Sequence, residues 1–431
     1  MFGFMNTSRI SLALLVSLWA CAPIAASGQE LTAFGLITIE PSHVLNGEGS
    51  NVDSIAFWET DDPAETLMFV TGKSNDLVEV WRYPFEDNEL DPIEFPANVN
   101  GVVVDQETDT LYVSDRIVSV IHLPNLEVSE EFGRGDIAAG ENNLDILKHA
   151  DGRTLIYVSD DHNVHRFDAD GFVHLDSFAP PVTSIETVLA DDFHQLIHVP
   201  EEQGPEGSPG VFVYHPDGTP YEQNGTNRYG NDGEFQLDEE GVILYTFPTG
   251  GIGDDGTGFI VVSDQRADVN EYEFFDRITW AHLGTLRLQG ISNTDGIASI
   301  QRPLPDYPLG LFAAIDDDTA TAIVGWDVIF KAIGWDVSQT NPHSAMNQRI
   351  AIEEIGGERH LTYTFPSLTG VTYSVNGSVD LIRFNQPLAE VLPASSGGLP
   401  PLSEGLLYRT FRLIEPIKDQ PKGFLRLDVN P

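Results

Sequence analysis

The segment Leu155-Ile-Tyr-Val-Ser-Asp160 decides the fold, because its pattern of an apolar strand ending in a small residue and an acid recurs along the chain. Related segments occupy residues 67–72, 110–115, 196–201, 259–264 and 311–316. They end at Gly72, Asp115, Glu201, Asp264 and Asp316. The spacings between successive ends are roughly 43, 45, 41, 63 and 52 residues, which indicates an internal structural repeat.

A repeat of this length is typical of the blades of a β-propeller, and six copies predict six blades. Flanking strands such as Val78-Glu-Val-Trp81 and Val211-Phe-Val-Tyr214 are rich in β-branched and aromatic residues. Each sheet can therefore bury a face against the next, and a closed ring leaves few exposed edges. The alternative is an open array of β-sandwiches, which would not demand a near-constant period. We predict an all-β chain with a six-bladed β-propeller over residues 35–335.

The repeat stops after about Gly334, and a second β-rich segment follows over residues 345–431. Its apolar strands, such as Leu361-Thr-Tyr-Thr-Phe365 and Val371-Thr-Tyr-Ser-Val375, are separated by clusters of Pro, Gly and Ser, which are turn signals. We predict a small sandwich-like domain with a surface loop at 393–401. No residue pattern in it points to chemistry, which is typical of sorting, anchoring or stabilising modules.

The N-terminus carries a secretory signal pattern over residues 1–28. Arg9 precedes the apolar run 10–20, and small residues follow through Gly28; the run is too short to span a bilayer comfortably. Cleavage there would remove Cys21, the single cysteine of the chain, and exclude disulfides. In the alternative interpretation, Leu18-Trp-Ala-Cys21 is an imperfect lipoprotein motif and Cys21 carries a lipid anchor. We expect a secreted or periplasmic protein, or one anchored at the cell surface.

The chain is strongly acidic, with 67 Asp and Glu against 22 Lys and Arg and a formal charge of -45. Nucleic acids and anionic membranes are poor partners for such a surface, because binding to phosphate needs basic patches. The acidity has two explanations that are compatible with each other. It favours solubility in salty water, and clustered carboxylates hold hard cations.

Four blocks of sequence resemble the calcium-dependent β-propeller phytases. Ser292-Asn-Thr-Asp-Gly-Ile297, with 307–316 and Val324-Gly-Trp326 after it, is similar to that family's DTDGI, PxGLFVAQDG and VPW elements. Residues 190–202 are similar to its ADDE-x-x-x-LYIAEED blade. Residues 238–245 and 258–265 are similar to its DIEGLTIY and YLLASSQG strands. The order of the blocks is kept across about residues 35–335, so the resemblance implies the family's fold.

Carried over position by position, the resemblance implies a set of calcium ligands and two phosphate-binding cations. The implied ligands are Glu186, Glu201, Glu240, Gln265, Asp295 and Asp316, and such oxygen donors suit calcium. The implied cations are Lys73 and Arg116; an Arg offers a bidentate fork to phosphate. The alternative is that the acids are solvated turn residues and the two cations are solvated surface groups.

The chain also departs from the family pattern. Ser54 and Ile55 stand where the family's DADDPAIW has a metal-binding Asp and a Pro. A TGKE-like element is replaced by Ser159-Asp-Asp-His162, so Asp161 stands in place of a phosphate-binding Lys, and Asn143 stands in place of a Tyr. Ile315 replaces a Gln. By the family's standard, the implied calcium cluster is incomplete.

The resemblance implies a secreted calcium-dependent phosphomonoesterase that hydrolyses phytate or a related phosphate ester with a metal-activated water. We expect calcium as its cofactor, a phosphorylated small molecule as its partner, and a monomer. A second hypothesis is a propeller that has lost the chemistry and serves as an extracellular binding module. A third is another calcium-dependent hydrolase, such as a lactonase, on the same scaffold. His194 and His198 lack further zinc ligands and are interpreted as ordinary surface histidines.

Overall fold

The computed structural model describes residues 33–86, 89–96, 99–138, 140, 142–202, 210–247, 254, 256–335, 349–368, 372–378, 388–394, 406–416 and 424–430. The expected signal segment 1–28, Cys21 and most of the expected loop 393–401 lie outside these residues. The chain divides into two compact units. The larger comprises Leu31–Phe247 and Asp254–Asp336, and the smaller contains Val337–Pro431.

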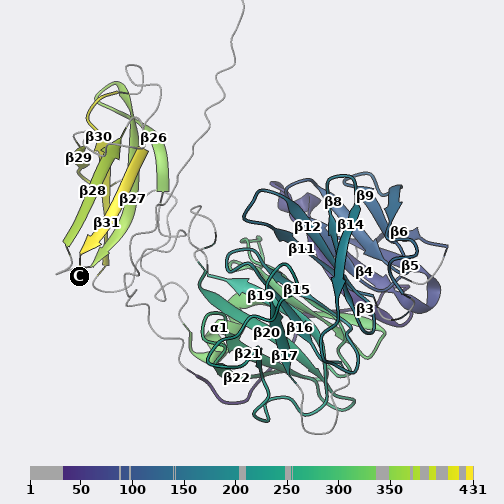
Figure 1. Cartoon of the computed structure of the whole chain (residues 1–431). Helices are drawn as coiled ribbons and strands as arrows, with labels where there is room; N and C mark the ends of the chain where they lie inside the picture. The colour runs from purple at the N-terminus through teal and green to yellow at the C-terminus, as the bar shows by residue number, and fades with distance from the viewer. Residues whose placement is uncertain are drawn as a thin grey trace, which may run out of the picture. The chain divides into compact units, whose positions relative to one another are not determined.

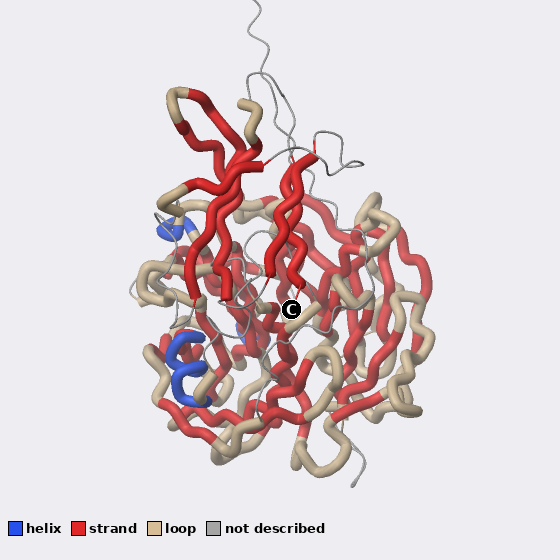
Figure 2. The backbone as a smooth tube through the Cα atoms, turned by 90° about the vertical axis from the view of Figure 1, so that its left-hand side faces the viewer, coloured by secondary structure: helices blue, strands red, loops and turns tan. Residues whose placement is uncertain are grey.

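Strands dominate both units, and helix is limited to short segments (Figure 2). In the larger unit, four sheets are each built from four consecutive antiparallel strands. The first is β3 (Val52–Trp58), β4 (Leu67–Gly72), β5 (Leu77–Arg82) and β6 (Glu89–Glu94), and the second is β7 (Val102–Asp105), β8 (Thr110–Ser114), β9 (Val118–His122) and β10 (Val128–Phe132). The third is β11 (Leu144–Lys148), β12 (Thr154–Ser159), β13 (Val164–Asp168) and β14 (Val173–Phe178), and the fourth is β15 (Leu189–Asp191), β16 (Leu196–Pro200), β17 (Val211–Tyr214) and β18 (Arg228–Tyr229).

Two further sheets are completed by strands from the start of the unit. The fifth contains β19 (Asp238–Thr246), β20 (Gly258–Gln265), β21 (Glu271–Asp276) and β22 (His282–Leu288), with β1 (Ile37–Ile39) parallel to β22 at its edge. The sixth contains β23 (Ile297–Ile300), β24 (Leu311–Asp316) and β25 (Ala320–Gly325), with β2 (His43–Leu45) antiparallel to β25. Two strands that precede the first sheet in the chain are therefore the edge strands of the fifth and sixth sheets.

The first strands of these sheets contact one another in sequence. β3 contacts β7, β7 contacts β11, and the series continues through β15 and β19 to β23, which contacts β3 again. The six repeated sequence segments form the second strands β4, β8, β12, β16, β20 and β24. The all-β prediction is confirmed, and the arrangement is propeller-like (Figure 1).

The core lies between neighbouring sheets, because each sheet presents a row of buried apolar side chains to the next. Five clusters of buried apolar residues each join two neighbouring sheets. Each cluster is represented by one residue from either sheet: Val70 with Ala313, Phe69 with Leu111, Val120 with Ile156, Tyr157 with Val199, and Val213 with Val262. Full burial of one such side chain contributes about 1.5–3 kcal/mol. The β-branched and aromatic strands identified in the sequence thus supply the contacts between sheets.

Helix α1 (Trp326–Ile333) follows β25 and packs on an aromatic group. The ring of Trp326 lies 4.7 Å from that of Tyr245 and 5.6 Å from that of Phe259. The helix ends at Gly334, whose φ of 78° is the left-handed conformation that favours glycine. Within the described residues, no helix has the length and apolarity required to cross a bilayer.

The smaller unit also consists of antiparallel strands. One sheet has the order β26 (Arg349–Ile355), β27 (Glu358–Leu368), β30 (Leu406–Leu413) and β29 (Leu388–Val391). A separate pair joins β28 (Thr372–Ser378) and β31 (Phe424–Asn430). The strands expected in this segment are therefore present.

Candidate functional site

In four of the described sheets, a side-chain hydroxyl near the end of the second strand donates a hydrogen bond to the backbone just before the next sheet. Thr71, Ser114, Ser159 and Ser263 donate to the main-chain oxygens of Asn100, Asn142, Glu186 and Thr294, at 2.6, 2.5, 2.9 and 2.9 Å. Each acceptor lies just before the first strand of the next sheet. The small residue in the repeated segment therefore holds one turn against the start of the next sheet, and side chains from both converge there.

Lys73 is the centre of this convergence. Its ammonium nitrogen lies 2.6 Å from Oδ1 of Asp53 and 3.4 Å from Oε1 of Glu186. The three side chains are only 12%, 2% and 10% exposed. Lys73 follows β4, Asp53 lies in β3 and Glu186 precedes β15, so the ion pairs link the first and fourth sheets.

Asp295 lies in the same group of charges. Its Oδ1 accepts a hydrogen bond from Nε2 of Gln265. Burial raises the pKa of the Asp295 carboxyl well above its usual range, and the neighbouring Asp53 carboxylate raises it further, while Lys73 lowers it. A bound cation would favour the ionised form, because it would offset the repulsion between these carboxylates.

Three carboxylates meet beside Lys73 with a spacing that suits a metal ion. Glu186, Glu202 and Glu240 each offer one oxygen, and these oxygens lie within 4.8 Å of one another. The donors are carboxylates alone, which are ligands that calcium prefers. The residues present therefore fit a hard divalent cation. Asp53 and Asp295 add carboxylates from the first and sixth sheets.

The structure brings five of the eight sequence-predicted residues into this group: Lys73, Glu186, Glu240, Gln265 and Asp295. The other three have different surroundings. Oε1 of Glu201 accepts the amide of Thr183 at 3.0 Å, and Oδ1 of Asp316 accepts the amide of Ser292 at 3.2 Å. Arg116 is exposed and forms no ion pair with any residue in the described ranges.

Sequence reasoning missed Asp53 and Glu202 as members of the group. Each is a direct neighbour of a residue that the motifs singled out, namely Ser54 and Glu201. The period of two along a strand does not separate Asp53 from Ser54, because β3 has a register shift between Val52 and Ile55 and the Ser54 hydroxyl donates to Oδ2 of Asp53 at 3.2 Å. The Ser54 hydroxyl also accepts a hydrogen bond from Nδ2 of Asn143 at 3.0 Å. The two departures from the family pattern thus form a pair.

A second acidic group in the fifth sheet carries its own cations. Asp264, Glu271 and Glu273 also place oxygens within 4.8 Å of one another. Arg266 pairs with Asp264 and Glu271, and Arg287 pairs with Glu271. His282 lies 2.7 Å from Glu273. Internal ion pairing accounts for this group.

The interpretation of both histidines as surface residues is wrong for His198, which is 1% exposed. Its Nδ1 lies 3.2 Å from the Tyr229 hydroxyl, and burial lowers its pKa to about 4. Nε2 of His194 lies 2.9 Å from the Gly256 carbonyl oxygen. The two rings have separate partners, and the cause of the error was the strand position of His198, whose side chain enters the core.

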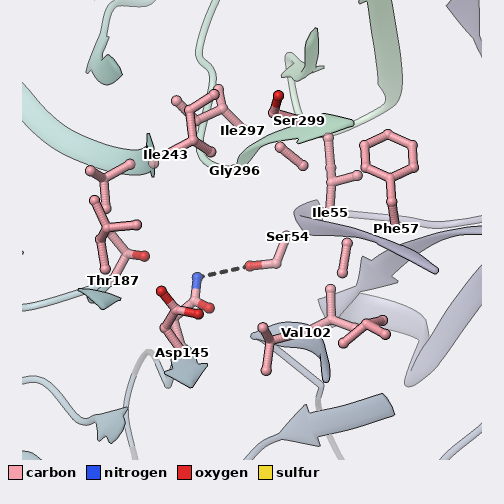
Figure 3. Close-up of a pocket in the computed structure, with 18 of the residues that line it drawn as sticks. Ser54, Ile55, Phe57, Val102, Asp145, Thr187, Ile243, Gly296, Ile297 and Ser299 are labelled. Carbon is pink, nitrogen blue, oxygen red and sulfur yellow. Dashed lines mark hydrogen bonds between the residues drawn. The ribbon is translucent and has the colours of Figure 1, made fainter. Parts of the chain in front are cut away.

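The first strands of the six sheets line a cavity of about 250 Å³ (Figure 3). Its lining residues come from the first strands β3, β7, β11, β15, β19 and β23 or from the residues adjoining them. Ser54, Thr187, Gly241 and Gly296 line it and directly follow Asp53, Glu186, Glu240 and Asp295 in the chain. The cavity therefore begins where the acidic group ends.

Comparison with known proteins assigns no family to the chain. No protein-family model matches it, and no curated protein matches it. Among solved structures it is similar to the hydrazine synthase of Kuenenia stuttgartiensis, with 13% sequence identity and a TM-score of 0.46. That match covers 71% of this chain and 86% of the other. The similarity is too low to carry an argument about function.

Proposed function

We propose that residues 35–335 form a six-bladed β-propeller, with the six sheets as blades and their first strands around a central channel. The closed series of contacts from β3 through β23 and back to β3 supports this proposal. So does the pairing of β2 with β25, because a strand from before the first blade that completes the last one closes the ring.

On this scaffold, we infer a calcium-dependent phosphomonoesterase that acts on phytate or a related phosphate ester. One observation carries the inference, the convergence of Glu186, Glu202 and Glu240 beside the Lys73 ion pairs at the end of the cavity. The sequence resemblance implies the same place for the site. Fold alone would not support an activity.

Each group of the site has a role in this proposal. Glu186, Glu202 and Glu240 would hold calcium, which when bound neutralises phosphate oxygens and lowers the pKa of a coordinated water. The ammonium of Lys73 fixes the positions of Asp53 and Glu186. Arg116 is exposed, so its guanidinium is available to a substrate phosphate.

A second candidate is a catalytically inactive module that binds a ligand through calcium. The ion pairs of Lys73 with Asp53 and Glu186 favour it, because a phosphate would have to compete with two carboxylates for this ammonium. The hydrogen bond between Asn143 and Ser54 favours it as well, since two positions of the implied site bind each other.

Phosphate release distinguishes the candidates. We expect the wild-type protein to release phosphate from phytate or from simple phosphate esters in calcium and to stop in chelator. Arg116→Ala should lower the rate on the order of a hundredfold, because a charge-assisted contact that strengthens in the transition state is lost. Arg134→Ala is the matched control, since Arg134 is exposed and pairs with Glu131. Absence of calcium-dependent release, or an unchanged rate in Arg116→Ala, would favour the binding module.

A further inference from the structure

The residues that line the cavity limit the kind of ligand that can bind there. The walls combine apolar side chains, among them Ile55, Phe57, Val102, Ile243 and Ile297, with an equal share of polar groups. Figure 3 shows these side chains surrounding one space, with Ser54 and Thr187 on its wall. A volume of about 250 Å³ is close to the lower end of ligand pockets, roughly 300 Å³. The space suits a small, partly apolar group.

The charged groups of the cavity are negative. Among the described residues that line it there is no Lys or Arg, whereas Glu59 and Asp145 are both present. Burial raises the pKa of each of these carboxyls to about 7. A phosphate group in this space would meet carboxyls and no Lys or Arg among the described lining residues, and burying a charge without a partner is costly.

Neutral polar groups line both ends of the cavity: Gln106 and Gln301 follow the ends of β7 and β23, and a second set adjoins the carboxylate group. The hydroxyl of Ser54 accepts from Asn143, and both residues line the space together with Thr187. Ser54 follows Asp53 and Thr187 follows Glu186 in the chain, so hydrogen-bonding groups lie between the acidic group and the rest of the cavity. An ester oxygen could lie at this level, with its organic part deeper in the cavity.

We propose that the site takes phosphomonoesters of small neutral alcohols, whose organic part enters the cavity, in preference to polyphosphorylated substrates such as phytate. This inference rests on the proposed function. In the reaction, the oxygen of water forms a bond to phosphorus and the bond from phosphorus to the ester oxygen breaks. The leaving oxygen keeps the electron pair and gains a proton that the water loses, so the products are a neutral alcohol and inorganic phosphate.

The small supply of cations supports this preference. A substrate with several phosphates needs several cationic partners, yet the chain has 22 Lys and Arg in total. Lys73 is already paired with Asp53 and Glu186. A single phosphate placed on the calcium group can be contacted by Arg116, and its uncharged remainder in the cavity requires no further cation.

Phenyl phosphate and phytate are the two probes, compared with the full chain in calcium. We expect kcat/KM for phenyl phosphate to exceed that for phytate at least about tenfold, because the cavity has room for one small uncharged group and no Lys or Arg among its described lining residues for further phosphates. Ile243→Trp fills the cavity and should raise KM for phenyl phosphate about tenfold or more. Val173→Trp is the matched control, because Val173 is 54% exposed on β14.

Calorimetric binding of both probes separates this inference from the proposed function. If phytate is the better substrate, the inference is overturned and the phosphatase proposal stands. If neither probe is hydrolysed but phenyl phosphate binds in calcium and Ile243→Trp loses it, the phosphatase proposal fails and the ligand class stands. Absence of phenyl phosphate binding overturns the inference. If Ile243→Trp unfolds, the wild-type comparison of the two probes decides alone.

Discussion

Arg277 is a buried cation with two carboxylate partners. Its guanidinium donates to both oxygens of Asp191, at 2.8 and 2.6 Å, and to both oxygens of Asp254, at 2.6 Å. The Arg277 side chain is 0% exposed and that of Asp191 is 1% exposed. Removing one partner of a buried ion pair leaves an uncompensated charge, which is more costly than the pair itself is stabilising.

We therefore expect Arg277→Ala to lower the free energy of unfolding by about 3–5 kcal/mol. The measurement is urea denaturation followed by tryptophan fluorescence. Arg134→Ala provides the comparison, since its ion pair with Glu131 is exposed and such pairs contribute at most about 1 kcal/mol. Equal losses of unfolding free energy in the two variants would show that the buried ion pairs of Arg277 stabilise the protein no more than an exposed pair does.

Asp145 gives the stability of the protein a dependence on pH. It accepts the amides of Ile146 and Ala190 at 2.8 and 2.7 Å. Burial raises its pKa from 3.8 to about 7; the two hydrogen bonds oppose the shift, and Asp192 adds to it. Between these two values the folded state holds a proton that the unfolded state releases. The free energy of unfolding therefore falls as pH rises from about 4 to 7 and is independent of this group above that range.

Asp145→Asn should remove this part of the pH dependence. We expect the difference in unfolding free energy between pH 5 and pH 8, measured by urea titration, to be smaller in Asp145→Asn than in the wild type. Asp170→Asn is the control, because Asp170 is exposed. A difference that is the same in all three proteins would show that Asp145 does not hold the proton.

The candidate site shows what residue patterns can and cannot predict. Glu186, Glu240 and Asp295 were predictable because each precedes the first strand of a repeat or lies at its start. Asp53 was not predictable, because the motif matched Ser54 to the metal-binding position. Which of these two neighbours reaches the carboxylate group depends on the register shift between β3 and β4. Likewise, Glu201 turns to the amide of Thr183 while Glu202 joins the carboxylates. A turn sequence alone does not set these directions.

Among the elements, the repeated second strands were predictable from the period of the sequence. The completion of the fifth and sixth sheets by β1 and β2 was not, since each has three residues and lies before the first repeat. Helix α1 was not predicted either. Its positioning is tertiary, because Trp326 donates to the Ser299 hydroxyl at 2.8 Å and packs on rings from β19 and β20.

We expect Trp326→Ala to destabilise the larger unit by about 3–5 kcal/mol, because it removes a fully buried ring from this aromatic group. Val328→Ala on the same helix is the matched control. Val328 is 40% exposed, and its truncation should cost about 0.5 kcal/mol or less. Differential scanning calorimetry of the two variants measures the contrast. Similar melting temperatures in both would mean that α1 contributes little to the stability of the unit.

At the scale of the whole molecule, the net charge of -45 and the carboxylate group have different consequences for stability. Self-repulsion of a high net charge destabilises the compact state, and any salt screens it. The convergence of Glu186, Glu202 and Glu240 is local, so a divalent ion that binds there stabilises the folded state by mass action. The two effects are separable because only the second depends on which cation is supplied.

We expect calcium to raise the melting temperature more than sodium chloride of equal ionic strength. Binding at one hundred times the dissociation constant stabilises the folded state by about 2.7 kcal/mol. Glu202→Gln should lose most of this calcium-specific gain, because it removes one carboxylate of the group. Glu131→Gln, whose carboxylate lies in an exposed ion pair, should keep it. Scanning calorimetry in calcium, in sodium chloride and in chelator provides the measurement. If the two salts give the same increase, the acidity acts through screening alone, and the carboxylate group is not a calcium site.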